Sequence, residues 1–235
     1  MSLKNWDNKT WLSSNNYINF FNNFLLNQVY LNKGSYILDI GCGRGKILGN
    51  LASKLRLNKK PLGIDIEQHK DRDKRIIFKK IDAINYLKKS KKKFDLILLK
   101  QTIHFFSQKE IKKLLLLSKN CLTPNGHVII FTLATTRNEI PTFLLMKKKL
   151  KKSLIRDEKI LRFILNSHQN ILIKRFSYKV KITKKKYMQM IKNRYISILL
   201  NLKLTEILKG IDEINLKYKQ KINFKDKLIC IILKK

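Results

Sequence analysis

Cysteine, proline, glycine and acidic residues are all scarce in this chain of 235 residues. The three cysteines, Cys42, Cys121 and Cys230, are odd in number and lack CxxC spacing, which argues against both a disulfide framework and a zinc site. With only three prolines and eight glycines, no stretch has the composition of a linker or a fibrous repeat. We therefore expect a reduced, cytoplasmic protein that folds as one α/β domain and needs no metal.

Long hydrophobic runs are missing as well. The longest ones, such as Leu114 to Leu117 and Leu228 to Leu233, are much too short to cross a bilayer. Residues 1–7 lack the continuous apolar region of a signal peptide. The sequence therefore predicts a protein that is neither secreted nor membrane-spanning, without a membrane partner.

Positive charge dominates: 52 lysines and arginines against 16 acidic residues give a formal net charge of +36. Such an excess attracts nucleic acid, anionic lipid or acidic substrates. The lysines are spread along the chain, however, and do not form one stripe with interleaved aromatic residues. We interpret most of the charge as the background of an A+T-rich coding sequence, and we keep RNA as the alternative partner.

The first thirty residues carry aromatic and aliphatic side chains at partly helical spacing, from Trp6 and Trp11 through Tyr17 to Leu26. This spacing predicts an amphipathic helix or helix pair. We expect residues 1–33 to pack as a lid over the rest of the chain.

From residue 34 to 135, short apolar runs alternate with helical stretches. Continuous apolar runs are typical of strands buried on both faces, and their alternation with helices indicates a parallel sheet. The predicted strands are Tyr36–Ile40, Pro61–Ile66, Arg75–Phe78, Phe94–Leu99 and His127–Thr132, and the predicted helices are Lys46–Leu55, Ala83–Lys88 and Gln108–Cys121. A turn at residues 123–126 is expected before the last of these strands.

Residues 136–235 follow a different pattern. A helix over residues 146–167 leads to a strand over 171–182, helical segments over 185–209 and a last strand over 226–233. Two late strands without a usual crossover helix predict antiparallel pairing at the sheet edge, with the helices between them as a second lid. The predicted fold is a doubly wound, mostly parallel seven-stranded sheet of the Rossmann-like kind, with an antiparallel edge strand and helical lid elements.

The strongest chemical signal is the turn after the first strand, with the sequence Ile37-Leu38-Asp39-Ile40-Gly41-Cys42-Gly43-Arg44-Gly45-Lys46. Glycines let the backbone approach a ligand, and the next helix presents free N–H groups and a positive dipole end. The dinucleotide pattern G-x-G-x-x-G would need glycine at position 46, and the phosphate loop would need Ser or Thr at position 47. Lys46 and Ile47 exclude both.

Further acids follow the next strands. Asp65 ends the second strand, about as far beyond the glycines as the acid that meets ribose hydroxyls in nucleotide-binding sheets. Asp82 follows the third strand. Each of these acids could also be a solvated loop residue or a helix N-cap.

The pattern D-x-G-C-G-x-G, from Asp39 to Gly45, resembles the first motif of class I S-adenosylmethionine-dependent methyltransferases. The resemblance covers residues 36–132, and it implies that the turn cradles the methionine end of S-adenosylmethionine. In this family the acid after the second strand meets the ribose, the residues after the third meet the adenine, and the loop after the fourth flanks the methyl group. The implied cofactor-binding residues are Asp39, Gly41, Cys42, Gly43, Gly45, Asp65, Ile66, Asp82, Ala83, Lys100 and Gln101.

His104 lies just beyond the fourth strand, where the methyl acceptor is expected. Its pKa near working pH suits a general base for an oxygen, sulfur or nitrogen nucleophile, although it could instead be a hydrogen-bonded residue at a helix start. The Asn-Pro-Pro-Tyr type of motif is absent. The other histidines, His69, His127 and His168, have no metal-like spacing.

More loosely, an N-terminal aromatic helix and a helical insert before the last strand resemble small-molecule methyltransferases of the trans-aconitate methyltransferase kind. The resemblance implies a lidded substrate pocket, with Trp11, Tyr17, His104, Tyr187, Arg194 and Tyr195 as candidate pocket residues. We therefore predict methyl transfer to a small metabolite, possibly anionic. The alternatives are an RNA methyltransferase and a protein that binds the cofactor without catalysis.

Overall fold

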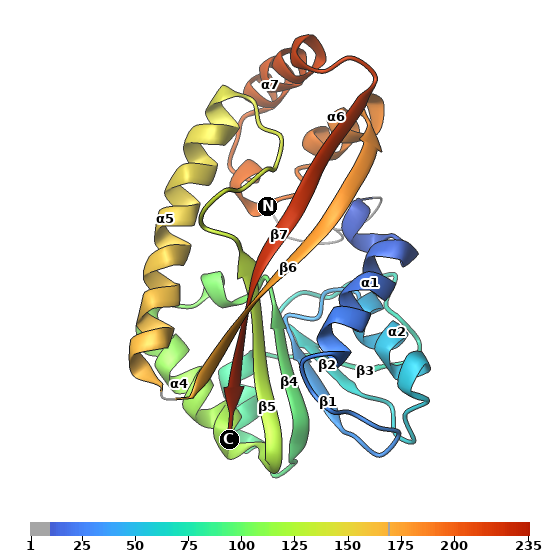
Figure 1. The fold of residues 1–235 in the computed structure, drawn as a ribbon, viewed down its shortest axis with the longest axis vertical. Coiled ribbons are helices and arrows are strands. Elements are labelled where there is room, and N and C mark those ends of the chain that lie inside the picture. The colour runs from blue at the N-terminus through green and yellow to red at the C-terminus, as the bar shows by residue number, and fades with distance from the viewer. Residues whose placement is uncertain (1–9, 169) are drawn as a thin grey trace.

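The computed structural model describes residues 10–168 and 170–235, which form one seven-stranded sheet in the order β3-β2-β1-β4-β5-β7-β6 (Figure 1). The strands are β1 (Ile37–Ile40), β2 (Leu62–Asp65), β3 (Ile77–Lys80), β4 (Phe94–Lys100), β5 (Leu122–Leu133), β6 (Ile171–Thr183) and β7 (Lys221–Lys234). β7 runs antiparallel to both β5 and β6, and the remaining pairs are parallel. The predicted doubly wound, mostly parallel sheet is confirmed.

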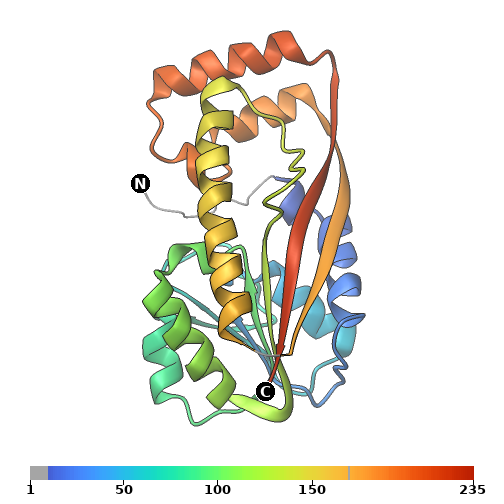
Figure 2. The ribbon, with the colours of Figure 1, turned by 60° about the vertical axis from the view of Figure 1, so that its left-hand side comes forward.

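Helices cover both faces of the sheet (Figures 1 and 2). They are α1 (Asn15–Leu26), α2 (Lys46–Leu55), α3 (Ala83–Lys89), α4 (Gln108–Asn120) and α5 (Leu144–Ser167). Successive strand residues point to opposite faces: Leu96 and Leu98 join the core under α1 and α2, whereas Ile97 and Leu99 join the core under α3, α4 and α5. β1 and β4 are therefore mostly apolar, as the sequence predicts for strands buried on both faces, whereas the edge strands β3 and β6 are largely exposed.

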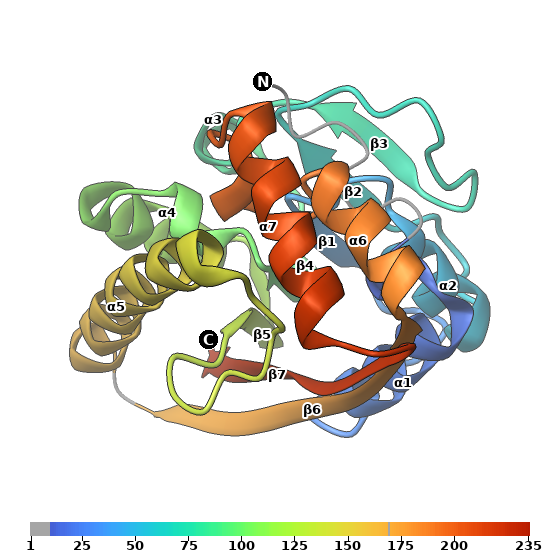
Figure 3. The ribbon, with the colours of Figure 1, turned by 90° about the horizontal axis from the view of Figure 1, so that it is seen from above.

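The two last strands extend well beyond the carboxyl edge of the parallel strands (Figure 1). Between them lie α6 (Lys184–Lys192), the short 3₁₀ helix η3 (Ser197–Leu199) and α7 (Leu204–Lys217). Seen from above, α6 and α7 lie over the carboxyl edge of the sheet (Figure 3). The expected helical insert is therefore present and lies where parallel sheets bind ligands.

Several element boundaries differ from the sequence prediction: β3 is shifted by two residues, α7 ends at Lys217 where 209 was predicted, and β5 and β7 start earlier than expected. β5 begins at Leu122 and contains the expected turn residues 123–126, where the pairing jumps from Phe94↔Leu122 to Leu96↔His127. β7 begins at Lys221, five residues earlier than predicted, because buried and exposed side chains already alternate there with Ile222 and Phe224 inside. This alternation lets β7 pair with β6 along its full length.

The N-terminal segment covers a face of the sheet more than it covers the carboxyl edge. Trp6 lies outside the described residues. α1 packs beside α2 and β6, and the ring of Phe21 lies 4.6 Å from that of Phe131. Among residues 10–33, the 3₁₀ helix η1 (Trp11–Ser13) alone reaches the cavity described below, through Trp11 and Leu12. The lid that we predicted is thus confined, in the described part of this segment, to η1.

None of the helices within residues 10–168 and 170–235 is both long and apolar enough to cross a membrane.

Candidate active site

A cavity of about 490 Å³ lies at the carboxyl edge of the parallel strands, a volume typical of small-molecule sites. Its floor consists of the residues that follow β1, β2, β3 and β4, and its cover consists of η1, one face of α5 and residues 195–198. Every predicted cofactor-binding residue lines it: Asp39, Gly41, Cys42, Gly43, Gly45, Asp65, Ile66, Asp82, Ala83, Lys100 and Gln101. Trp11, His104 and Tyr195 of the predicted substrate set line it as well.

The glycine-rich turn needs its glycines for two different reasons. Gly41, Gly43 and Gly45 all have positive φ, of 71°, 54° and 71°, a region that strains other residues. A Cβ on Gly41 would lie 2.3 Å from the Thr102 side chain, so this glycine is also required by packing. A Cβ on Gly43 would meet nothing within 4 Å. The backbone of Gly43 therefore faces open space, so that a ligand can approach it closely.

Asp65 connects the end of β2 to this turn. Its carboxylate accepts hydrogen bonds from the Gly43 N–H at 2.8 Å and from the Glu67 N–H at 2.9 Å, and His69 Nε2 lies 3.7 Å from it. Burial raises the pKa of Asp65, but the hydrogen bonds from His69, Glu67 and Gly43 outweigh it and hold the pKa below its usual value. Asp65 is thus an ionised acceptor in the cavity wall.

The pKa of Asp39 is shifted in the opposite direction to that of Asp65. Burial raises the pKa of Asp39 to about 8; Lys100 opposes the shift and the charge of Asp65 adds to it. Asp39 Oδ1 is buried without a hydrogen-bond partner among the described residues. A buried carboxylate oxygen with no partner is costly, and here it borders a cavity in which a cationic ligand group could pair with it.

Asp82 and Ala83 close the far side of the floor. Asp82 is the N-cap of α3 and accepts the Asn85 N–H at 2.9 Å, so the N-cap role that the sequence left open is real. The same residue lines the cavity, and the two roles are compatible because a carboxylate accepts several hydrogen bonds. Ile66 adds an exposed apolar surface nearby.

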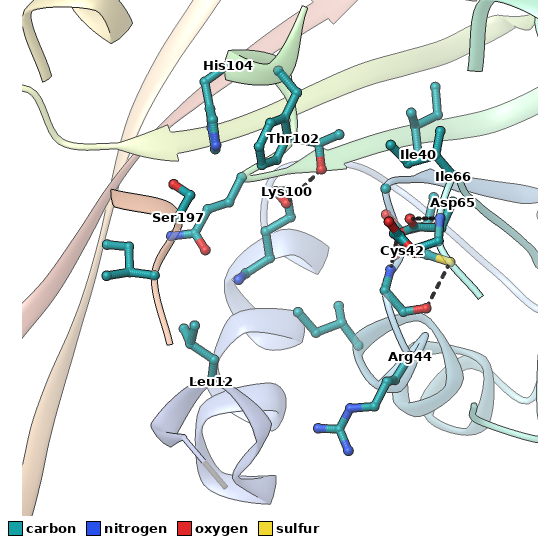
Figure 4. A pocket seen from close by; sticks show the side chains of 18 of the residues that line it. Leu12, Ile40, Cys42, Arg44, Asp65, Ile66, Lys100, Thr102, His104 and Ser197 are labelled. Atoms are coloured by element: carbon teal, nitrogen blue, oxygen red, sulfur yellow. Dashed lines mark hydrogen bonds between the residues drawn. The ribbon is translucent and has the colours of Figure 1, made fainter. Parts of the chain in front are cut away.

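His104 lies in the 3₁₀ helix η2 (Ile103–Phe105), directly after β4. Its ring lies 4.2 Å from that of Phe105. Burial lowers the pKa of His104, Asp157 raises it, and Arg156 lowers it. Figure 4 shows Cys42 and Asp65 at one end of the cavity and Lys100, His104 and Ser197 at the other. A neutral histidine thus stands at the end away from the acid of β2.

Two buried acids of the cavity were not predicted. Asp226 on β7 is 1% exposed and accepts Trp11 Nε1–H at 3.2 Å. Asp157 on α5 is 4% exposed and accepts two hydrogen bonds from the guanidinium of Arg156. Both acids occupy positions where the sequence pattern predicts a buried apolar side chain. Asp226 continues the alternation of Ile222 and Phe224 along β7, and Asp157 lies on the same face of α5 as Leu150.

Two predicted substrate-binding residues lie outside the cavity lining. Tyr17 is fully buried and packs edge-on against Phe176 and Tyr178, because helix α1 lies on the face of the sheet. Arg194 donates to the Leu202 carbonyl at 3.1 Å and thereby stabilises the loop before α7. We withdraw both as substrate contacts. Tyr187, also outside the lining, shares a 2.8 Å hydroxyl contact with Tyr195 and so supports a residue that does line the cavity.

A family model described as a methyltransferase domain matches residues 31–194, about two thirds of the chain. The chain belongs to this methyltransferase family. The match begins just before β1 and ends after α6, so it includes all the strands that carry the cavity floor. No curated protein matches the sequence significantly.

Solved structures of methyltransferases share the fold at low sequence identity. A methyltransferase described as belonging to an antibiotic biosynthesis pathway of Anabaena variabilis has 18% identity and a TM-score of 0.60, with 89% of this chain and 95% of that chain covered. A methyltransferase from Geobacter sulfurreducens, in complex with S-adenosylhomocysteine, has 15% identity and a TM-score of 0.55, with 94% and 92% covered. The plantazolicin methyltransferase BpumL, in complex with a pentazolic desmethylPZN analog and S-adenosylhomocysteine, has 16% identity and a TM-score of 0.54, with 98% and 88% covered.

Proposed function

We propose that this methyltransferase uses S-adenosylmethionine and transfers its methyl group to a small molecule enclosed by η1, α5 and the helical insert. One observation carries the proposal: a single cavity contains both the glycine turn at residues 41–45, with Asp39 and Asp65, and a chamber beneath η1 and α5 that holds His104. We call this second part the acceptor chamber. When bound, the cofactor supplies a methyl group on a positively charged sulfur.

The residues of the floor suit this cofactor in shape and charge. The open space at Gly43 leaves room for the methionine end, and the unpaired Oδ1 of Asp39 suits its ammonium group. The ionised Asp65 can accept hydrogen bonds from ribose hydroxyls, and Asp82 and Ala83 can border the adenine. Two of the similar structures named above are complexes with S-adenosylhomocysteine, which supports this choice.

The cover favours a small acceptor. Trp11 and Leu12 from η1, Leu150 from α5 and Ile198 from η3 contribute apolar walls, and such walls exclude water from a transfer site. In this proposal residues 34–135 bind the cofactor, whereas η1 and elements of residues 136–235 enclose the acceptor, an arrangement resembling the trans-aconitate methyltransferase kind.

His104 is the proposed base. It stands at the carboxyl end of β4, and burial holds its pKa below the usual value, so that its imidazole is neutral near pH 7. A neutral imidazole can take the proton that an oxygen or nitrogen nucleophile must lose. Transfer itself then depends on alignment of the nucleophile with the methyl group in a water-poor chamber.

The test is methyl transfer from labelled S-adenosylmethionine to two substrate pools, a nuclease-treated metabolite extract and bulk RNA freed of metabolites. We expect label in the metabolite pool, and we expect Asp65→Ala to abolish it at low cofactor concentration. An exposed acid on α7, changed by Asp212→Asn, serves as the matched control. Label found only in RNA, at a defined nucleotide and at physiological salt, would replace this proposal with the RNA alternative.

A further inference from the structure

The cavity is acidic although the chain is strongly basic. Among residues 10–168 and 170–235, seven acidic residues line it but only three lysines and arginines do so, whereas the full sequence holds 16 acidic residues and 52 lysines and arginines. The acids are Asp39, Asp65, Glu67, Asp82, Glu110, Asp157 and Asp226, and the cations are Arg44, Lys46 and Lys100. Formal charge in the lining is therefore negative inside a molecule with a net charge of +36. The high lysine content of the chain does not explain why acidic residues outnumber basic ones in the cavity lining.

The acids belong to the two ends of the cavity. Four of them follow β1, β2 and β3, where the cofactor is proposed to lie. The other three come from elements outside the floor: Asp226 from β7, Asp157 from α5 and Glu110 from α4. Glu110 is exposed and caps α4 through a capping box with Ser107. Asp157 and Asp226 are the buried acids of the acceptor end.

Both carboxylates border the cavity at high burial, 4% exposed for Asp157 and 1% for Asp226. Removing a carboxylate from water is costly unless other groups satisfy it. The bonds from Arg156 and Trp11 each use one oxygen of the respective carboxylate. A carboxylate offers about four acceptor positions, so each can also accept hydrogen bonds from a ligand in the cavity.

Lys100 does not offset these acids for an anionic ligand. Burial raises the pKa of both Asp39 and Asp226, and the ammonium group of Lys100 opposes this shift at each carboxyl group. It also lies 5.3 Å from the Tyr17 ring centre and 5.4 Å from that of Phe21, within cation–π range. The ammonium group of Lys100 thus interacts with acids and aromatic rings of the cavity wall, as the guanidinium of Arg156 does with Asp157, so neither cation is placed to bind an anionic acceptor alone.

We propose that the methyl acceptor is an amine: a primary or secondary amino group on a largely apolar body, held in its ammonium form by Asp226 and Asp157. This inference rests on the proposed methyl transfer and replaces the anionic metabolite considered from the sequence. The apolar body would lie against Leu133, Ile140, Leu150 and Ile198, and against the ring of Tyr195. A cationic head group and an apolar body match the two kinds of surface in the chamber.

The transfer step balances with the residues present. The bound ammonium gives one proton to His104 and becomes a neutral amine. Its nitrogen lone pair forms the new N–C bond to the methyl group while the C–S bond breaks, and the electrons of that bond remain on sulfur. The positive charge passes from sulfur to the methylated nitrogen, which the same two carboxylates stabilise.

The test measures binding to the protein saturated with S-adenosylhomocysteine. The probes share one apolar body and differ in head group: 2-phenylethylamine, 2-phenylethanol and 3-phenylpropanoate, with matched triads on indole and octyl bodies. We expect at least one amine to bind tenfold or more tightly than its alcohol and carboxylate partners. Asp226→Asn and Asp157→Asn should each reduce that affinity about tenfold, and together they should remove the preference.

Glu158→Gln is the matched control, because Glu158 adjoins Asp157 on α5 but pairs with Arg162 at the surface. The affinity of each variant for S-adenosylhomocysteine reports whether it is folded, and the head-group comparison on the parent protein stands even if a variant fails to fold. The inference is overturned if no amine is preferred in any triad, or if the preference survives in the folded double variant. If the parent protein does not bind S-adenosylhomocysteine, the proposed function itself has failed.

Discussion

Asp39 and Asp65 end neighbouring strands, yet burial acts on them with different results. Asp65 receives backbone N–H groups from Gly43 and Glu67, which stabilise its charge, whereas Asp39 Oδ1 is buried without a partner. The pKa of Asp65 is therefore lowered and that of Asp39 is raised to about 8. The carboxyl group of Asp65 is thus ionised at a lower pH than that of Asp39, and a cation beside Asp39 would favour its ionised form.

The raised pKa of Asp39 predicts proton release on cofactor binding. Near pH 7 the carboxyl group is mostly protonated, and an ammonium group beside it favours the ionised form. Titration calorimetry with S-adenosylhomocysteine, in two buffers of different ionisation enthalpy, should show release of about one proton by the parent protein and close to none by Asp39→Asn. Equal release by both proteins would contradict this role.

The same shift makes stability depend on pH in the ligand-free protein. The folded state retains a proton on Asp39 that the unfolded chain loses above its ordinary pKa, so stability should decrease as the pH rises from about 4 to about 8. Urea unfolding of the parent and of Asp39→Asn across this range measures the difference. If the difference between the two proteins does not change with pH, Asp39 does not titrate as described.

His104 should contribute to turnover more than to binding. His104→Ala should lower turnover by about a hundredfold and leave the affinity for S-adenosylhomocysteine nearly unchanged. Because burial lowers its pKa, activity should be lost only below the usual pH range of histidine titration. His127→Gln, a histidine on β5 outside the cavity lining, is the control. Turnover of His104→Ala within a few-fold of the parent would assign it a structural role.

At the scale of elements, the position of α5 determines the acceptor chamber. The N-terminal end of α5 has no side-chain cap of its own, and the Leu144 N–H instead donates to Glu213 of α7 at 2.7 Å. This bond joins the two helices that cover the carboxyl edge. Glu213→Ala should lower the free energy of unfolding by about 1 kcal/mol, as expected for a lost cap.

Glu213→Ala should change the affinity for the acceptor and the affinity for S-adenosylhomocysteine to different extents. Because α5 carries Leu150 and Asp157, a shift of α5 should weaken acceptor binding but not the binding of S-adenosylhomocysteine. Urea unfolding and the two titrations measure these effects, with Asp212→Ala as the exposed neighbouring control. Equal weakening of both ligands would show that the chamber and the cofactor floor are not separate.

The residues that line the floor of the cavity were predictable from the sequence because the signals for them are local. Each strand of the floor ends directly before the residues that line it, and the left-handed backbone at Gly41, Gly43 and Gly45 needs glycine at fixed positions. The chamber is built differently: Asp157 on α5 and Asp226 on β7 are 69 positions apart in the sequence and line the same cavity. Helical periodicity also placed Tyr17 on a buried face without indicating which surface buries it.

At the level of the whole molecule, we expect the basic surface charge to contribute little to substrate binding. Binding of RNA by dispersed lysines would release counterions, and log affinity would fall against log salt with a slope of about −0.7 per single-strand phosphate contact. A ligand enclosed in the cavity should respond much less. We therefore expect methyl transfer to a small amine to change less than threefold between low and physiological salt. A steep loss over this range would favour a polymer substrate.

The most direct test of the central claim is calorimetric titration of the parent protein, Gly43→Val and Asp65→Ala with S-adenosylhomocysteine. The parent should bind one equivalent. Asp65→Ala should bind about ten- to a hundredfold more weakly because a charge-assisted hydrogen bond is lost, and Gly43→Val should lose binding because a side chain would fill the open space at the turn. Unchanged affinity in both variants, with the fold intact by circular dichroism, would contradict the claim that this turn and the acid of β2 hold the cofactor.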